Sequence, residues 1–155
     1  MIRTIDAFEE DEHGDWVAML SCLHTQHVRH QPPFRDRAWV LTATGRADRV
    51  GTSIDCPLCD RAELPDGLRV VRTVGPFDDE TLPVGLRRDH RTAERTWAMV
   101  HVLEGSVRFT MATDPAVDRV LGASGSQAVP PGTPHAVSPQ GAARLTIDLM
   151  TRLDP

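Results

Sequence analysis

The chain has 155 residues, a formal net charge of -5 and 40% hydrophobic residues, a composition typical of an ordinary folded protein. The negative charge argues against general binding to nucleic-acid backbones, and no stretch approaches the roughly 18 apolar residues of a membrane span. No signal peptide is visible and the 3 cysteines are an odd number, so we expect a cytoplasmic protein whose thiols are metal ligands rather than disulfides.

The first half of the chain predicts short strands with few apolar residues to bury. Residues 16–22 read as a strand, and the side-chain face that carries Trp16 continues through Cys22 to His24. A second strand is predicted over residues 37–42. A domain this small seldom holds together on hydrophobic area alone, so we expect a bound metal to supply the missing stability.

All three cysteines lie in this half, and their spacing predicts a metal site. Cys56 and Cys59 are two residues apart, so both thiolates can reach one ion, while Pro57 helps to hold the turn and Cys22 adds a third thiolate. A tetrahedral zinc site commonly uses three thiolates and one imidazole. The alternatives are inert buried cysteines and a redox dithiol, but no strand-helix-strand pattern of a redox motif surrounds residue 56. We therefore predict a structural zinc ion.

Three histidines compete for the fourth ligand position. His24 shares the predicted strand face with Cys22, whereas His27 has the more usual loop spacing from it. His30 is the least favoured, because it precedes two prolines that force the chain to be extended. The predicted ligands are Cys22, His24, His27, Cys56 and Cys59.

The same residues belong to a longer pattern between residues 2 and 65. It consists of Gly14-Asp15-Trp16-Val17-Ala18, Cys22-x-His24, Gln26-His27-Val28-Arg29-His30, Pro32-Pro33, Trp39-Val40 and Cys56-x-x-Cys59-Asp60-Arg61. This pattern resembles a small bacterial domain family of unknown function. Leu23 stands where that family usually has glycine, and Phe34 where it usually has tryptophan. The resemblance implies a zinc-ribbon-like metal-binding fold and brings no established activity.

The second half has the pattern of a β-barrel or sandwich. A strand is predicted over residues 68–74 and a loop over residues 75–80. Candidate strands then recur between turn residues, at 97–103, 106–112, 117–121, 127–130, 135–138 and 143–150. We divide the chain into a Cys/His zinc-binding domain at 1–64, a linker with a first strand at 65–80 and a β domain at 81–155.

Two short motifs in this half carry a second resemblance. The turn Val102-Leu103-Glu104-Gly105 and the sequence Pro130-x-Gly132-x-x-His135 resemble the first and second motifs of the cupin superfamily. Leu82-Pro83, His90-x-Thr92 and Ile147-Asp148-Leu149 are similar to the tellurite-resistance branch of TehB/YeaR-like cupins, over about residues 80–152. The resemblance implies a mainly β chain in which a single-domain cupin β-barrel, or jelly roll, follows the zinc-binding domain.

The resemblance also implies a second metal site. The usual glutamate ligand of the first cupin motif falls on Ala98, which cannot coordinate a metal. The TehB/YeaR-like pattern offers His90, His135 and Asp148 instead, a set that suits zinc or iron(II) and leaves positions open for water or substrate. His101 is a fourth candidate, although Val100 and Val102 compete with it for the barrel interior.

Three functions follow as hypotheses. The first is a metal-binding, stress-response module that binds a small molecule or anion without turnover, which Ala98 favours. The second is a mononuclear metal enzyme, dioxygenase- or isomerase-like, that uses His90, His135 and Asp148. The third is an adaptor that responds to metal or oxidant through its thiolates. Tellurite chemistry is not assigned, because in TehB-type proteins it belongs to a methyltransferase domain that this sequence does not contain. We expect no nucleic-acid or membrane partner and a symmetric homodimer.

Overall fold

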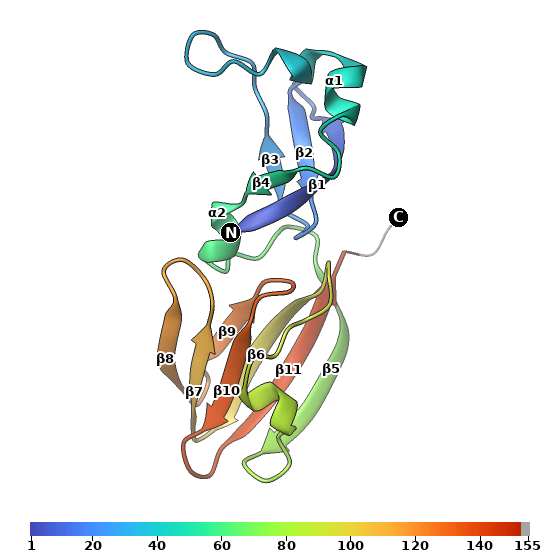
Figure 1. Ribbon diagram of the computed structural model, residues 1–155. Coiled ribbons are helices and arrows are strands. Elements are labelled where there is room, and N and C mark those ends of the chain that lie inside the picture. The colour runs from blue at the N-terminus through green and yellow to red at the C-terminus, as the bar shows by residue number, and fades with distance from the viewer. Residues whose placement is uncertain (153–155) are drawn as a thin grey trace. The chain divides into compact units, whose positions relative to one another are not determined.

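The structure is a computed structural model, and it describes residues 1–152. Its contacts divide the chain into two compact units, one of Ile2–Cys56 and the other of Met1 with the chain from Pro57 onward. Both units are built mainly of β-strands, which confirms the predicted mainly β fold (Figure 1). Within residues 1–152, no helix is long and apolar enough to cross a membrane.

The first unit is a four-stranded antiparallel sheet with two short helices. Its strands pair in the order β3-β2-β1-β4. Their bounds are β1 (Ile2–Glu10), β2 (Trp16–Leu20), β3 (Thr25–His27) and β4 (Ser53–Asp55). Between β3 and β4 lie the 3-10 helix η1 (Ala38–Leu41) and the helix α1 (Ala43–Ala47).

The strand predicted over residues 37–42 is wrong, because this segment forms η1 and the start of α1. Of the four η1 residues only Val40 is buried, so the segment has no alternating buried face that would hold it in a sheet. Thr42 then begins α1, with its hydroxyl accepting a hydrogen bond from the backbone N–H of Gly45 at 3.1 Å. Trp39 packs edge-on against Phe8 of β1, with ring centroids 5.8 Å apart.

The apolar core of the first unit is small. Its buried aliphatic side chains are Ile5, Val17, Ala18, Leu20, Leu23, Val28 and Val40. The guanidinium of Arg46 lies 3.4 Å from the centroid of the Trp16 ring, and that of Arg49 lies 5.0 Å from the Trp39 ring. Contacts of this kind cover aromatic rings at the surface and add little to a core. Hydrophobic burial in this unit is therefore modest.

The second unit consists of two antiparallel sheets. One has the strand order β10-β7-β8 and the other the order β5-β11-β6-β9. Its elements are α2 (Pro57–Asp60), β5 (Arg69–Asp78), η2 (Val84–Arg87), β6 (Trp97–Glu104), β7 (Ser106–Met111), β8 (Val117–Gly122), β9 (Ser126–Val129), β10 (His135–Pro139) and β11 (Arg144–Thr151). The six strands predicted between residues 97 and 150 are confirmed within a residue or two.

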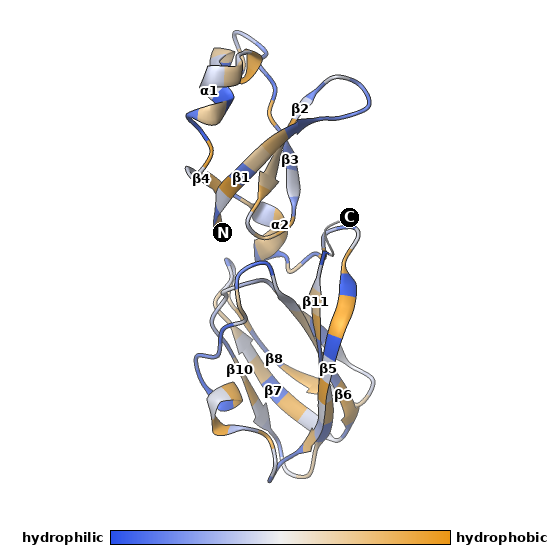
Figure 2. Cartoon of the chain, turned by 90° about the vertical axis from the view of Figure 1, so that its right-hand side faces the viewer, coloured by the Kyte–Doolittle hydropathy of each residue, from blue (hydrophilic) through white to orange (hydrophobic). Residues whose placement is uncertain are grey.

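The first strand of this unit, β5, is longer than predicted. The loop predicted over 75–80 is wrong in its first part, because β5 runs on to Asp78 along β11. β5 is the edge strand of its sheet and carries the exposed residues Val70 and Val71. Figure 2 shows an orange, hydrophobic segment on this strand.

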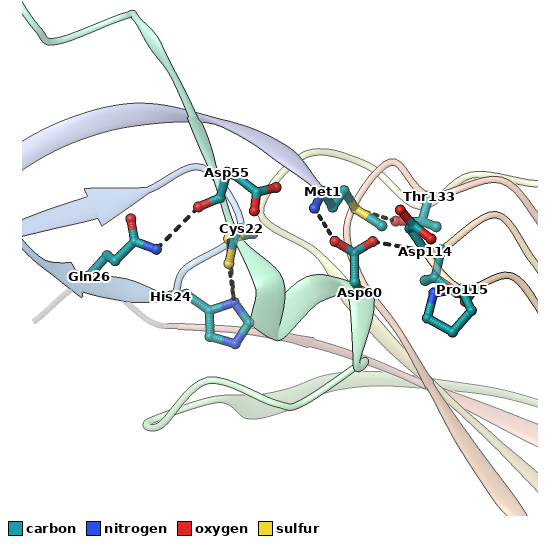
Figure 3. Close-up of polar contacts among 11 residues, drawn as sticks. Met1, Cys22, His24, Gln26, Asp55, Asp60, Asp114, Pro115 and Thr133 are labelled. Carbon is teal, nitrogen blue, oxygen red and sulfur yellow. Dashed lines mark hydrogen bonds and ion pairs between the residues drawn. The ribbon is translucent and has the colours of Figure 1, made fainter.

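Contacts of Asp60 join α2 and Met1 to the second unit. Asp60, at the end of α2, accepts a hydrogen bond from the backbone N–H of Asp114 at 3.0 Å. It also pairs with the Met1 amino group (Figure 3).

The core of the second unit lies between its two sheets. Its buried members come from both, and include Phe109 and Val107 of β7 and Val100 of β6. Along β11, Leu145 and Ile147 are buried on the core side, while Thr146 and Asp148 between them are only partly buried. Side chains alternate between the two faces of a strand, so Asp148 belongs to the outer face of its sheet.

Candidate metal centre

The turn between β2 and β3 presents the first two candidate ligands, Cys22 and His24. The strand predicted to run to Cys22 and His24 ends at Leu20, and the chain then folds back on itself. The backbone N–H of Leu23 donates to the carbonyl of Leu20 at 2.7 Å, and the N–H of Leu20 donates to the carbonyl of His24 at 2.9 Å. Leu23 adopts a φ of 71°, in the left-handed region that glycine favours. The turn therefore explains why the family that this segment resembles usually has glycine at this position.

The start of α2 presents the other two, Cys56 and Cys59. Pro57 occupies the first helical position, where its missing N–H leaves no partner unsatisfied. The helix turn closes with the N–H of Arg61 donating to the carbonyl of Pro57 at 3.2 Å. Gln26 on β3 donates from its side-chain amide to the carbonyl of Asp55 at 3.1 Å, which fixes the approach of the chain to Cys56 (Figure 3).

These four side chains form one buried cluster. Their ligand atoms all lie within 4.8 Å of one another, and each residue is at most 3% exposed. The Sγ atoms of Cys22 and Cys56 are 3.8 Å apart, and the Nδ1 of His24 lies 3.5 Å from each of them. Around a tetrahedral zinc with ordinary bond lengths, two sulfurs would be about 3.8 Å apart, and a sulfur and a nitrogen about 3.6 Å apart. The residues therefore fit a tetrahedral metal ion.

The electrostatics of the cluster also favour a cation. Burial alone lowers the pKa of His24, but its hydrogen bonds with Cys22 and Cys56 and the charges of those thiols outweigh burial and raise the pKa to about 9. The protein thus stabilises positive charge between these sulfur atoms. A divalent metal ion between the sulfur atoms would balance the charge of the thiolates more fully than a protonated imidazole does. His24 would then bind the ion as neutral imidazole.

His27 and His30 lie away from the cluster. His27 is exposed, and its Nε2 lies 2.9 Å from the Oδ2 of Asp11. That hydrogen bond, together with backbone N–H groups, lowers the pKa of Asp11 to about 2. The Nδ1 of His30 accepts a hydrogen bond from the backbone N–H of Arg37 at 3.0 Å. Of the competing histidines, the structure therefore places His24 with the three cysteines.

The second unit contains a cavity of about 110 Å³ between its sheets. Two of the predicted site residues, His90 and His135, lie in its wall. Their backbones pair through two hydrogen bonds of 2.9 and 3.0 Å, and their rings meet edge to face with centroids 5.2 Å apart. The remaining wall is Val74, Leu86, Thr92, Ala98, Val100, Val137, Ile147 and Leu149. Ala98 cannot serve as a metal ligand, and its small side chain leaves space in the cavity.

The other two predicted residues, Asp148 and His101, lie on the outer face of the sheet. The Oδ2 of Asp148 is 3.1 Å from the Nε2 of His101, and its Oδ1 accepts a hydrogen bond from the hydroxyl of Thr73 at 2.5 Å. Ile147 and Leu149, on either side of Asp148, face the cavity. The structure therefore does not bring Asp148 or His101 to His90 and His135, because strand alternation separates them. Within residues 1–152 these four residues do not form one metal-ligand group.

The protonation of His135 is determined by its surroundings. Burial lowers the pKa of its imidazole, with a smaller contribution in the same direction from His90 and an opposing one from the hydrogen bond to Thr133. The Nδ1 lies 2.8 Å from the carbonyl oxygen of Thr133, which can only accept, so Nδ1 carries the proton. The neutral ring then has its lone pair on Nε2.

We expect this shift to make the second unit less stable in acid. Since the folded state holds His135 neutral below its ordinary pKa of 6.5, the unfolded chain binds the proton first as the pH falls. Stability should therefore decrease as the pH drops below about 6.5, until His135 is protonated in the folded state as well. A proton NMR titration of the His135 ring checks this expectation, and a midpoint at or above 6.5 would contradict it.

Comparison with known families gives two matches. Residues 7–63 match the family model described as a protein of unknown function, DUF3565, and residues 72–147 match the TehB-like domain. The resemblances to a domain family of unknown function and to TehB-like domains are therefore confirmed. No curated protein matches the chain.

Solved structures agree with the second match. TehB from Haemophilus influenzae has a TM-score of 0.51 at 20% identity, over 56% of this chain and 32% of TehB, so this chain corresponds to about a third of that protein. A protein from Escherichia coli K12, solved by the Northeast Structural Genomics Consortium, has a TM-score of 0.54 at 18% identity, over 60% of this chain and 90% of its own. At these identities the likeness shows the fold alone.

Proposed function

We propose that this chain, which carries a DUF3565 domain followed by a TehB-like domain, is a small-molecule-binding protein whose first domain is stabilised by a structural zinc ion. One observation supports the zinc most directly: three buried thiols and one imidazole have the mutual spacing of tetrahedral zinc ligands. The small-molecule function rests on the cavity between the sheets of the second unit.

The donor set supports zinc and a structural role. Thiolate and imidazole are ligands that suit zinc, and tetrahedral sites of sulfur and nitrogen are typical of it. Cys22, His24, Cys56 and Cys59 would fill all four positions, whereas a catalytic zinc site keeps one position for water or substrate. The side chains are buried, so solvent has little access to the ion. We therefore assign no chemistry to this site beyond holding the fold together.

Binding without turnover is the better proposal for the second unit. The enzyme hypothesis needed a carboxylate beside His90 and His135, and Asp148 instead bonds to His101 and Thr73 on the outer face. The cavity wall is mostly aliphatic and has two imidazoles, a composition typical of a small-molecule pocket.

We expect His24→Ala to lose the zinc and His27→Ala to keep it. His24 and His27 are only three positions apart in the chain. Of the two, only His24 has its Nδ1 3.5 Å from the sulfur atoms of Cys22 and Cys56. Metal content by mass spectrometry on tag-free protein checks this expectation: about one zinc per chain in the wild type and in His27→Ala, and much less in His24→Ala after dialysis.

His135→Ala is the control for the second unit, and its zinc content should equal that of the wild type. Absence of zinc from the wild type after purification in zinc-supplemented medium would refute the proposed structural site. Loss of zinc from His27→Ala together with retention in His24→Ala would show that the fourth ligand is assigned incorrectly.

A further inference from the structure

We infer that the cavity between the sheets of the second unit binds a neutral molecule of about four to six non-hydrogen atoms, which donates a hydrogen bond to Nε2 of His135. This inference rests on the proposed small-molecule function and specifies the chemical class of its ligand. Three observations support it: the size of the cavity, the absence of acidic and basic side chains other than histidine from its wall, and the position of the proton on the His135 ring.

The cavity size limits the ligand. A protein cavity of about 150 Å³ lined by apolar side chains holds one benzene molecule. The cavity here, at about 110 Å³, is somewhat smaller, so a five-membered ring or a short branched alcohol matches it better than a six-membered ring. Seven of its ten wall residues are alanine, valine, leucine or isoleucine: Val74, Leu86, Ala98, Val100, Val137, Ile147 and Leu149.

The wall also disfavours an ion. None of the ten wall residues is an arginine, lysine, aspartate or glutamate. An anion entering the cavity would lose its hydration without gaining a fixed positive charge, and the desolvation of an unpaired charge is costly. Thr92 is engaged as an acceptor, since its hydroxyl oxygen receives a hydrogen bond from the backbone N–H of Gly132 at 3.3 Å. The two imidazoles are thus the main polar groups left for a ligand.

His135 is held ready to accept a hydrogen bond. Its Nδ1 is used by the Thr133 carbonyl at 2.8 Å, which leaves Nε2 as the ring nitrogen available to a ligand. The ring lies at 19° to the plane of the Phe109 ring and at 85° to that of His90, so packing on two sides limits its rotation. A ligand with one N–H or O–H group would satisfy this acceptor, and an isostere without a donor would leave it unpaired.

Pyrrole and furan test the inference, because they are rings of equal size and only pyrrole carries a donor. Each is titrated into the zinc-loaded chain of 155 residues and followed by proton–nitrogen NMR, including the ring nitrogens of His135. We expect pyrrole to bind with a dissociation constant at least about tenfold lower than that of furan and to shift the Nε2 signal of His135. Acetate, a small anion of four non-hydrogen atoms, should not bind in the cavity.

Two matched variants locate the site. Ala98→Val adds two methyl groups inside the cavity and should abolish pyrrole binding with His135 still in place. Ala136→Val adds the same groups beside His135 at a residue outside the cavity wall and should leave binding unchanged. Equal pyrrole affinity in the wild type and Ala98→Val would overturn the assignment to this cavity.

The outcomes separate this inference from the function on which it rests. If pyrrole and furan bind equally well, or acetate binds more tightly than pyrrole, the inferred ligand class is wrong and the cavity remains a binding site. If none of the three binds, small-molecule binding by this unit is refuted as well. The zinc measurements on His24→Ala and His27→Ala are independent of all these results.

Discussion

Replacement of Cys59 by serine is expected to release the metal and to unfold the unit of residues 2–56. Cys59 is fully buried in the ligand cluster, and its loss leaves three ligands for an ion that needs four. Only seven aliphatic side chains are buried in this unit, whereas metal binding in small zinc domains supplies apparent free energies of about 10–16 kcal/mol at neutral pH. The stability without metal is therefore expected to be too low to keep the sheet formed.

Hydrogen exchange resolved by residue measures this effect. The amides of β1 and β2 should lose their protection in Cys59→Ser and, equally, in the wild type treated with a zinc chelator. Leu58→Ala is the matched control, because Leu58 lies in the same turn of α2, is only partly buried and supplies no ligand. Full protection of β1 and β2 in metal-free protein would show that the metal does not hold this fold.

The second large effect is expected from Phe109→Ala, which should destabilise the second unit by about 3–5 kcal/mol. Phe109 is completely buried in the core between the two sheets. The substitution removes a ring from the core, and the surrounding structure relaxes only in part into the space, so the unit loses both transfer free energy and packing. The ring also lies against His135, and its removal should shift the NMR signals of that imidazole.

Denaturant unfolding, followed by a probe in the second unit, measures this loss. Val120→Ala on the adjacent strand β8 is the control, because its side chain is 62% exposed and its truncation should change stability by no more than about 0.5 kcal/mol. A cost below about 1 kcal/mol for Phe109→Ala would mean that the core between the sheets is not packed as described.

The fold was predictable where each strand buries one face. Between Trp97 and Thr151, apolar and polar residues alternate between turn residues, and the strands follow that pattern closely. The segment at 37–42 has strand-forming residues, but Val40 alone is buried and Thr42 caps a helix, so local propensity pointed the wrong way. Which apolar residue will be buried depends on distant partners, and a single sequence does not reveal them.

The candidate sites were predictable to a similar degree. The spacing of Cys56 and Cys59, with Cys22 as the remaining thiol, was enough to identify three ligands. His24 was favoured on an argument of strand phase, yet the turn at Leu23 is what places it beside Cys22. In the second unit, strand alternation places Asp148 on the outer face, because its more apolar neighbours Ile147 and Leu149 take the inner face.

The separation of the ligands along the chain has a consequence for biosynthesis. Cys22 and His24 emerge from the ribosome more than thirty residues before Cys56 and Cys59, so the cluster cannot be completed until α2 has been made. At a synthesis rate of about 5–20 residues per second, the segment that forms β1, β2 and β3 has only half of the ligand set for at least a second or two. The proposed zinc ion can therefore be held by all four ligands only after α2 has been synthesised.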